Sequence, residues 1–410
     1  MTTSVSKAAI SENQDTDTIM ALDAVWVMGT YIRKPILFVR GEGATLWDSE
    51  GRSYLDFLAG IAVVQVGHCH PRIAEAISSQ ARTLMHVSNL FHNPLQAKLA
   101  EQLCTRADMD KVFFCNSGAE ANEAALKIAR KWGKMQRGAD CYEIITFHGS
   151  FHGRTMGTVT ATAQPKYQAP FAPLVPGFHY SSLNDLEALK PLISERTCAI
   201  MVEPIQGEGG INLCSAEFLA GVRALCDAHN ILLILDEVQC GMGRTGKFLA
   251  SQSLGVQGDI VTLAKGIADG FPMGACLARG SSADTLVPGD HGSTFAGQPL
   301  ACAAALATLQ VMDEENLLDH SAKAGAHFMK ALKQLQGEMP NMIAEVRGMG
   351  LMIGVQLQLP SSKAVLQSLL DQGIIANAIG ENTLRFVPPL VVTEADCDRV
   401  VSALRIALNQ

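Results

Sequence analysis

Residues 231–248 read ILLILDEVQCGMGRTGKF. The five apolar residues at 231–235 end at Asp236, and a continuous apolar run of this length is typical of a strand covered by helices on both faces. A carboxylate at the end of such a strand is costly to bury unless a positive partner lies nearby. The stretch therefore predicts a strand of an α/β sheet whose carboxyl end carries an acid, at the edge where such sheets bind ligands.

The second half of the stretch is similar to a phosphate-binding loop, and a nucleotide hydrolase is the first alternative. That loop requires Ser or Thr directly after Gly-Lys to hold magnesium, and Phe248 stands there. The loop should also leave a strand separate from the acidic one, whereas here one strand would serve both purposes. We reject the hydrolase and interpret GMGRTGK as a flexible turn.

The rest of the chain predicts a three-layer α/β body with a smaller α+β part. Asn93 and Pro94 mark a helix start, and Thr393 is expected to cap the last helix. We expect an N-terminal β-rich arm at 1–70 that joins the smaller part, a large domain at 71–310 and a small C-terminal domain at 311–410. Short apolar runs predict the strands of the large domain, KVFFC, EIITF, CAIMVE, ILLILD, DIVTLA and GACLAR.

Composition narrows the class of protein. The chain has 410 residues, 48% of them apolar, and a formal charge of −8, which argues against a nucleic-acid partner. Its eleven cysteines include no CxxC pair, so we expect neither a zinc site nor a disulfide framework, and a cytoplasmic location. The first twenty residues lack the features of a secretory or transit signal, and ILLIL is too short to span a membrane.

Lys265 ends a second apolar strand, in DIVTLAKG. Taken alone, it is more simply interpreted as a strand-end lysine that reaches solvent. If it is partly desolvated, its pKa falls and it becomes a competent nucleophile toward an aldehyde. Together with Asp236, which would keep a pyridine nitrogen protonated, it suggests a pyridoxal phosphate site.

A phosphate site is available in FFCNSGAEANEAALKIAR, where Ser117, Gly118 and Ala119 lie between a strand and a helix. Backbone amides at a helix start bind anions without a basic side chain. A well-capped helix without a ligand explains this segment equally well when it is considered alone.

Six ordered motifs now converge, and with them the chain resembles the class III, ornithine-type aminotransferases of the fold-type I pyridoxal phosphate enzymes. The resemblance covers GHCHP at 67–71 through LRFVPP at 384–389. It rests on NSGAEANEAALKIAR, SFHGRT, EPIQGEGG, LDEVQCGMGRTG, TLAKGIADGFPMGA and HGSTFAGQPLA.

The resemblance implies roles for the residues around the cofactor. Lys265 matches the lysine that holds the cofactor aldehyde and shuttles a proton, and Asp236 matches the aspartate on the pyridine nitrogen. Val238 and Phe151 match the residues that pack on the two faces of the ring, and Gln239 matches the one that reaches the ring hydroxyl.

The resemblance also implies how substrates bind. Arg154 matches a carboxylate clamp, since a guanidinium fork binds both carboxylate oxygens. Arg385 matches a second arginine, for the α-carboxylate of glutamate or 2-oxoglutarate, and Glu208 matches the acid that pairs with it between substrates. Without the motifs, a surface ion pair would be the simpler interpretation of each arginine. Tyr31 falls loosely at the place of a substrate-contacting tyrosine.

Thr294 in HGSTFAG matches the threonine that reaches the cofactor phosphate of a neighbouring subunit, which implies a homodimer with shared active sites. Ala296 and Gln298 depart from the glycine and asparagine usual in this motif. The departures leave the threonine in place but weaken any inference about the subfamily.

The expected activity is transfer of an ω-amino group to 2-oxoglutarate, with N2-acetylornithine as the donor. Ornithine, succinylornithine, succinyldiaminopimelate and 4-aminobutyrate remain alternative donors, because they differ beyond the reacting amine. A pyridoxal-dependent mutase or racemase would not need two carboxylate-binding arginines. A non-catalytic binding protein would not need Lys265, Asp236 and Thr294 together.

Overall fold

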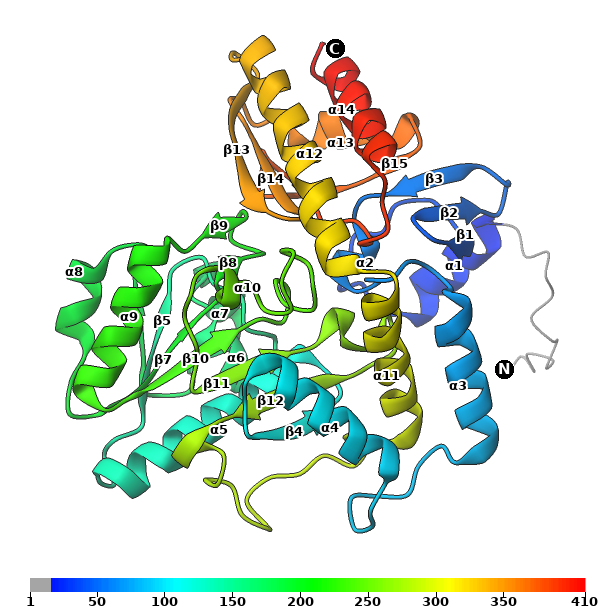
Figure 1. Cartoon of the computed structure of the whole chain (residues 1–410). Helices are drawn as coiled ribbons and strands as arrows, with labels where there is room; N and C mark the ends of the chain where they lie inside the picture. The colour runs from blue at the N-terminus through cyan, green and yellow to red at the C-terminus, as the bar shows by residue number, and fades with distance from the viewer. Residues whose placement is uncertain (1–15, 410) are drawn as a thin grey trace, which may run out of the picture.

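The computed structural model describes residues 16–409. The first fifteen residues of the predicted N-terminal arm lie outside that range. Figure 1 shows a large layered part with the C-terminal helices and their sheet stacked above it, and the N-terminal strands beside that smaller part. Of the described residues, none belongs to a helix long and apolar enough to cross a membrane.

The large part is built on a seven-stranded sheet with the order β4-β12-β11-β10-β7-β5-β6. Strands β11, β10, β7, β5 and β6 pair in parallel, whereas β12 runs antiparallel to both of its neighbours. The predicted α/β class with a mainly parallel sheet is confirmed. The strands are β4 (Lys111–Cys115), β5 (Glu143–Phe147), β6 (Phe178–Ser181), β7 (Thr197–Val202), β10 (Leu232–Asp236), β11 (Ile260–Leu263) and β12 (Gly274–Ala278).

Helices cover both faces of this sheet, as the unbroken apolar strands predict. Alternate residues of a strand point to opposite faces, so Leu232 and Ile234 of β10 pack in one cluster with α5 (Gly118–Arg137). Leu233 and Leu235 join the other cluster, which contains residues of α9 (Ala216–His229). By the same alternation Asp236 falls on the α5 side, and Glu237 on the other.

Further helices surround the sheet. Asn93 caps α4 as expected, since its side chain accepts a hydrogen bond from the Leu95 amide at 3.0 Å. These helices are α2 (Ala59–Ala62), α3 (Pro71–Thr83), α4 (Pro94–Ala107), α6 (Met156–Ala161), α7 (Pro165–Gln168), α8 (Leu186–Leu189), α10 (Ala250–Ser253) and α11 (Pro299–Glu314), with a two-stranded ladder of β8 (Ile205–Gln206) and β9 (Asn212–Leu213).

The smaller part joins both ends of the chain. Its C-terminal sheet has the order β13-β14-β17-β16, and β15 pairs in parallel with β3 of the N-terminal sheet β1-β2-β3. The strands are β1 (Phe38–Glu42), β2 (Thr45–Asp48), β3 (Ser53–Asp56), β13 (Ile343–Met349), β14 (Met352–Leu357), β15 (Ile374–Ile375), β16 (Asn377–Ile379) and β17 (Thr383–Phe386). The exact domain boundaries at residues 70 and 310 stay predictions.

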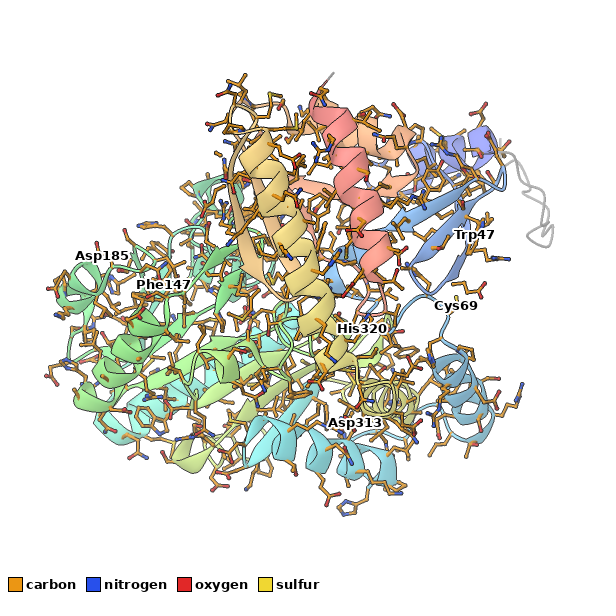
Figure 2. The ribbon with its side chains drawn as sticks, turned by 45° about the horizontal axis from the view of Figure 1, so that its top comes forward. Trp47, Cys69, Phe147, Asp185, Asp313 and His320 are labelled. Atoms are coloured by element: carbon orange, nitrogen blue, oxygen red, sulfur yellow. The ribbon has the colours of Figure 1, made fainter. Side chains whose placement is uncertain are left out.

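Four helices complete the smaller part: α1 (Thr16–Trp26), α12 (Leu317–Glu338), α13 (Ser362–Asp371) and α14 (Glu394–Leu408). Thr393 caps α14 as predicted. His320, labelled on α12 in Figure 2, lies 2.8 Å from the carbonyl oxygen of Val392 and so ties α12 to the segment before α14. Helix α1 was not expected, because a β-rich arm was predicted there.

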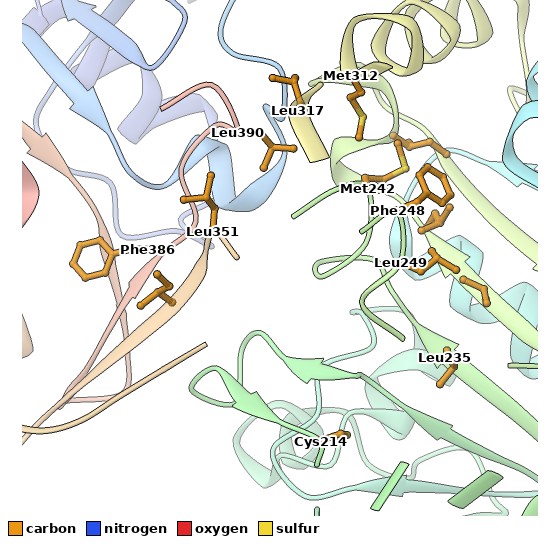
Figure 3. Packing of buried hydrophobic residues seen from close by; sticks show 14 of the residues in the cluster. Cys214, Leu235, Met242, Phe248, Leu249, Met312, Leu317, Leu351, Phe386 and Leu390 are labelled. Atoms are coloured by element: carbon orange, nitrogen blue, oxygen red, sulfur yellow. The ribbon is translucent and has the colours of Figure 1, made fainter. Parts of the chain in front are cut away.

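The interpretation of GMGRTGK as a flexible turn is wrong. The segment does turn, with Gly243 and Gly246 at positive φ, but it is almost wholly buried. Figure 3 shows Met242 and Phe248 in the buried cluster between the sheet and the smaller part. Phe248 thus serves the core, which explains an apolar residue at the position where a phosphate loop would need Ser or Thr.

Candidate active site

Asp236 ends β10 and is held by residues that the sequence analysis did not select. Its Oδ2 accepts a hydrogen bond from Asn122 Nδ2 and lies beside His152 Nδ1, both at 2.8 Å. Its Oδ1 accepts from the Val238 amide at 3.0 Å. Asn122, the His152 ring and the Val238 amide thus hold this buried carboxyl group at the cavity wall.

Asn122 and His152 come from different parts of the chain, α5 and the segment between β5 and α6. Asn122 lies on α5, the helix that covers the Asp236 side of the sheet, and its Oδ1 accepts from Thr262 of β11 at 2.7 Å. The imidazole of His152 is fully buried, and its Nε2 has no hydrogen-bond partner among residues 16–409. His152 could have been found in the SFHGRT motif, whereas Asn122 is one polar residue among several on its helix.

Lys265 comes two residues after the end of β11, behind Ala264, and starts a short 3₁₀ helix, Lys265–Ala268. Its backbone has φ of 48°, which is uncommon for a residue with a side chain and is typical of functional sites. Burial lowers the pKa of Lys265 to about 8, with the nearby Arg385 adding to the effect and Glu208 and Asp236 opposing it. A lysine near this pKa supplies neutral amine at physiological pH, as a nucleophile must.

Most of the predicted site residues line one cavity of about 380 Å³. It opens at the carboxyl ends of the parallel strands, the edge at which α/β sheets bind ligands. The predicted residues on its wall are Ser117, Gly118, Ala119, Phe151, Arg154, Asp236, Val238, Gln239 and Lys265.

The phosphate-binding end that we predicted is the start of α5. Ser117 caps the helix, and its Oγ accepts from the Glu120 amide at 3.2 Å. A Cβ on Gly118 would lie 2.7 Å from Cγ1 of Val238, so only glycine lets the helix start approach that side chain. The first amides of a 20-residue helix and its positive dipole end therefore face the cavity wall.

Glu203 is another buried acid at the end of a strand of the central sheet, and it was not predicted as a site residue. Its carboxylate accepts from the amides of Phe151 at 2.9 Å and Gly207 at 3.3 Å. Burial first, and then the Asp236 charge, raise the pKa of Glu203 well above its usual value. The signal was present, because Glu203 follows the apolar strand CAIMV as Asp236 follows ILLIL.

Arg154 lies exposed at the mouth of the cavity. Its guanidinium carbon is 4.0 Å from the ring centroid of Tyr167 and 5.3 Å from that of Phe151. Among the described residues no carboxylate forms an ion pair with it. The guanidinium is therefore held by aromatic faces, and its hydrogen-bond donors remain available to a substrate carboxylate.

Arg385 is buried on β17 and pairs with Glu208. Gln239, which also lines the cavity, accepts from Arg385 Nη1 at 3.1 Å and donates to Glu208 at 3.3 Å. Burial raises the pKa of Glu208, but the charge of Arg385 and its hydrogen bond lower it by more. The pKa of Glu208 therefore lies below its usual value. The expected pair is thus in place beside the cavity, joined to it through Gln239.

Comparison with known proteins places this geometry in a family. The model of the family Aminotransferase class-III matches residues 29–408. The chain belongs to this family. The class III aminotransferase is 48% identical over 385 residues to acetylornithine aminotransferase of Caldanaerobacter subterraneus, covering 94% of this chain and 98% of that one. It is also 48% identical over 383 residues to acetylornithine aminotransferase of Methanocaldococcus jannaschii, covering 93% and 96%.

Solved structures agree on the fold of this class III aminotransferase. Ornithine aminotransferase from Toxoplasma gondii superposes with a TM-score of 0.93 at 35% identity, covering 97% of this chain and 96% of that one. Acetylornithine aminotransferase from Elizabethkingia anophelis gives 0.86 at 34% identity, covering 97% and 100%. The predicted fold-type I class is therefore confirmed.

Pyridoxal phosphate is the cofactor of this family, and the cavity of the class III aminotransferase fits it. Asp236 is an anion for the pyridine nitrogen, Lys265 an amine for the aldehyde, and the start of α5 an anion site for the phosphate. Gly118, which has no Cβ, lets that helix start lie close to the Val238 side chain. Val238 and Phe151 supply the apolar walls that a flat ring requires.

Two predicted residues lie away from the cavity within a single chain. Thr294 lines a separate cavity of about 690 Å³, and the neighbouring Ser293 accepts from Asn116, a wall residue of the first cavity, at 2.9 Å. Its role across a subunit boundary stays a prediction. Tyr31 is 75% exposed and lines neither cavity, so one chain alone does not bring it to a substrate.

Proposed function

We propose that this class III aminotransferase moves the terminal amino group of N2-acetylornithine to 2-oxoglutarate, giving N-acetylglutamate 5-semialdehyde and glutamate. The observation that carries the donor is the set of acetylornithine aminotransferases that are 44–49% identical to nearly the whole chain. Two arginines that can take carboxylates, one exposed and one paired, support a reaction with two carboxylate-bearing substrates.

Each half-reaction assigns work to residues of the chain. When bound, pyridoxal phosphate supplies an aldehyde that accepts the amine and a ring that withdraws electrons. Lys265 Nζ would take up the proton lost from the carbon that bears the amine and give it back later in the same half-reaction, as general base and then general acid. Asp236 keeps the ring nitrogen protonated, and Asn122 and His152 hold Asp236 in place.

The arginines separate the two substrates. Arg154 binds the donor carboxylate at the cavity mouth, so that the distant terminal amine reaches Lys265. Glutamate and 2-oxoglutarate carry a second carboxylate, which displaces Glu208 from Arg385 and binds there. With acetylornithine bound, Glu208 stays on Arg385 and neutralises it.

We propose further that the active enzyme is a cytoplasmic homodimer. Thr294 and the large second cavity support shared sites, since they lie next to the start of α5 but outside the first cavity. All eleven cysteines are free, which suits a reducing compartment. The partners are small molecules, and we expect no nucleic-acid or membrane partner for a chain of net charge −8.

Ornithine is the second candidate donor, because ornithine aminotransferase from Toxoplasma gondii has a TM-score of 0.93. The test is a panel of donors with 2-oxoglutarate, comparing kcat/KM for acetylornithine, ornithine, succinylornithine, succinyldiaminopimelate and 4-aminobutyrate. We expect acetylornithine to exceed ornithine by at least about tenfold, the scale on which a pocket separates related side chains. A higher kcat/KM for any other donor would refute the assignment.

A further inference from the structure

Arg244 is the buried cation of the GMGRTG turn, and the catalytic scheme does not use it. Its side chain is fully buried, one of the largest of the described residues with no exposed surface. No carboxylate among residues 16–409 bonds to it, which is rare for a buried arginine. Burial lowers the pKa of Arg244 to about 9 against the opposing Asp56 charge, so the guanidinium is cationic at neutral pH.

The guanidinium instead bonds to neutral oxygens of three separate segments. Nη1 donates to the Leu351 carbonyl at 3.2 Å and to the Pro388 carbonyl. Nη2 donates to Oε1 of Gln65. A planar fork can reach several acceptors at once, which a single ammonium group cannot.

Two of these acceptors flank Arg385. Pro388 comes three residues after Arg385 in LRFVPP. Leu351 lies between β13 and β14, and β14 pairs with β17 so that Gly354 faces Arg385. Figure 3 shows Leu351 and Leu390 in the buried cluster between the smaller part and the GMGRTG turn, which contains Met242.

The third acceptor, Gln65, ties the same fork to the loop of Lys265. Its Nε2 donates to the Met242 carbonyl at 3.0 Å, and its own carbonyl accepts from the Leu390 amide at 2.7 Å. A Cβ on Gly266, the residue after Lys265, would lie 2.1 Å from Gln65 Cγ. Gln65 therefore packs directly against the backbone that carries the lysine.

The backbone of Arg244 is also bonded to the smaller part. Its carbonyl accepts from the Leu351 amide and from Ser321 Oγ, both at 3.0 Å. A Cβ on Gly350 would lie 2.6 Å from that carbonyl, and Gly350 has φ of 55°. The turn and the small part therefore meet with no room for adjustment at this point.

From this arrangement we infer that Arg244 is a positioning residue that sets the place of Arg385 relative to Lys265, and so the affinity for the dicarboxylate substrate. The inference rests on the proposed function, in which Arg385 binds the second carboxylate. Stability alone does not account for a buried cation, because apolar replacements of buried charged groups are often neutral or stabilising.

The test compares Arg244→Met and Arg244→Lys with the parent enzyme loaded with cofactor. One arm is calorimetric binding of glutarate, a five-carbon dicarboxylate without an amine. The other is the single-turnover rate with glutamate against that with acetylornithine. We expect Arg244→Met to weaken glutarate binding and to slow the glutamate half-reaction, each by about tenfold or more, the scale of a displaced binding group. The rate of the acetylornithine half-reaction should change by less than about threefold. Arg244→Lys should fall between, and it keeps the test open if the methionine variant does not fold.

Arg223→Met is the matched control. Arg223 lies on α9, where it pairs with Asp227 and Asp259 at 2.7 Å, and none of the three lines the cavity. It should lower the melting temperature without changing glutarate binding. Equal losses in both half-reactions, or unchanged glutarate affinity in both Arg244 variants, would overturn the inference. If the parent binds glutarate and both Arg244 variants weaken it, but acetylornithine does not react, the donor assignment fails and the positioning role stands.

Discussion

At the scale of single residues, the site depends on a few ionisable side chains that are buried away from solvent. Asp236 is held by Asn122, the His152 ring and the Val238 amide, whereas Lys265 is desolvated and its pKa falls to about 8. The sequence could predict both, because each comes at the end of a short apolar run. It offered His152 only as a member of the SFHGRT motif and gave no sign of Asn122, whose importance comes from its contact with Asp236.

Replacing Lys265 with Ala should abolish steady-state transamination, with a loss of at least about 10²-fold to 10⁴-fold for a missing general acid–base group. The variant should still bind pyridoxal phosphate non-covalently through Asp236 and the start of α5. Steady-state assays and dialysis against free cofactor measure the two effects. Full retained activity would remove the lysine from its assigned role.

Arg385→Ala should slow the glutamate half-reaction more than the acetylornithine half-reaction. The reason is that only glutamate brings a second carboxylate to the position that Glu208 occupies. Single-turnover absorbance measurements with each amine give the two rates. Equal losses would refute the division of work between the arginines.

The pH dependence of stability should reveal the buried lysine in cofactor-free protein. The pKa of Lys265 is about 8 when folded, against 10.5 for an exposed lysine. Between these values the unfolded chain binds the extra proton, so the Lys265 contribution becomes more favourable as pH rises from about 8 to 10.5 and is most unfavourable below 8. Lys265→Met should therefore be more stable than the parent below pH 8, with a gap that closes toward pH 10.5. Urea unfolding at several pH values measures it, and a gap independent of pH would contradict the lowered pKa.

At the scale of elements, apolar runs predicted six strands of the central sheet, and Asn93 and Thr393 predicted the caps of α4 and α14. Strand β6 was missed because FHYS has no continuous apolar run. The antiparallel direction of β12 was also missed, since it is set by the connection from β11 and leaves no mark on composition. The turn at 241–247 looked flexible because glycine tolerates exposed turns, yet here the glycines permit close packing.

Gly118→Ala should weaken cofactor binding by about tenfold, because a Cβ there meets Val238 at 2.7 Å and must displace either the ring wall or the start of α5. Gly337→Ala is the control, since Gly337 lies on α12 with nothing within 4 Å of an added Cβ. It should leave affinity unchanged and stabilise the helix by up to about 1 kcal/mol. Fluorescence titration of the apoprotein measures both, and equal affinities in the two variants would contradict the close approach.

At the scale of the whole molecule, one chain holds the lysine, the aspartate and both arginines, but places Thr294 outside the cavity. Asp236 and Lys265 could be predicted to lie together, because both come at the carboxyl ends of apolar strands. The contact between Arg385 and Gln239 could not be predicted, because it forms only when the smaller part packs against the large one, and no local sequence pattern specifies that packing.

Shared active sites predict complementation between two impaired subunits. A Lys265→Ala chain mixed with a Thr294→Ala chain should form hybrid dimers in which one site has both native residues. Random exchange makes half the dimers hybrid with one such site each, so activity should recover to about a quarter of the parent. Each variant alone, unfolded and refolded the same way, is the control. Activity no higher than the average of the two variants would contradict sharing through Thr294.

The central claim is that the cavity between Asp236 and Lys265 holds pyridoxal phosphate on that lysine. The most direct measurement is borohydride reduction of the cofactor-loaded enzyme, followed by proteolysis and mass spectrometry. We predict loss of the yellow absorbance band and a reduced pyridoxyl mass on Lys265, in the peptide that contains TLAKG. A reduced cofactor on another lysine, or no covalent label on an enzyme that binds the cofactor, would contradict the account.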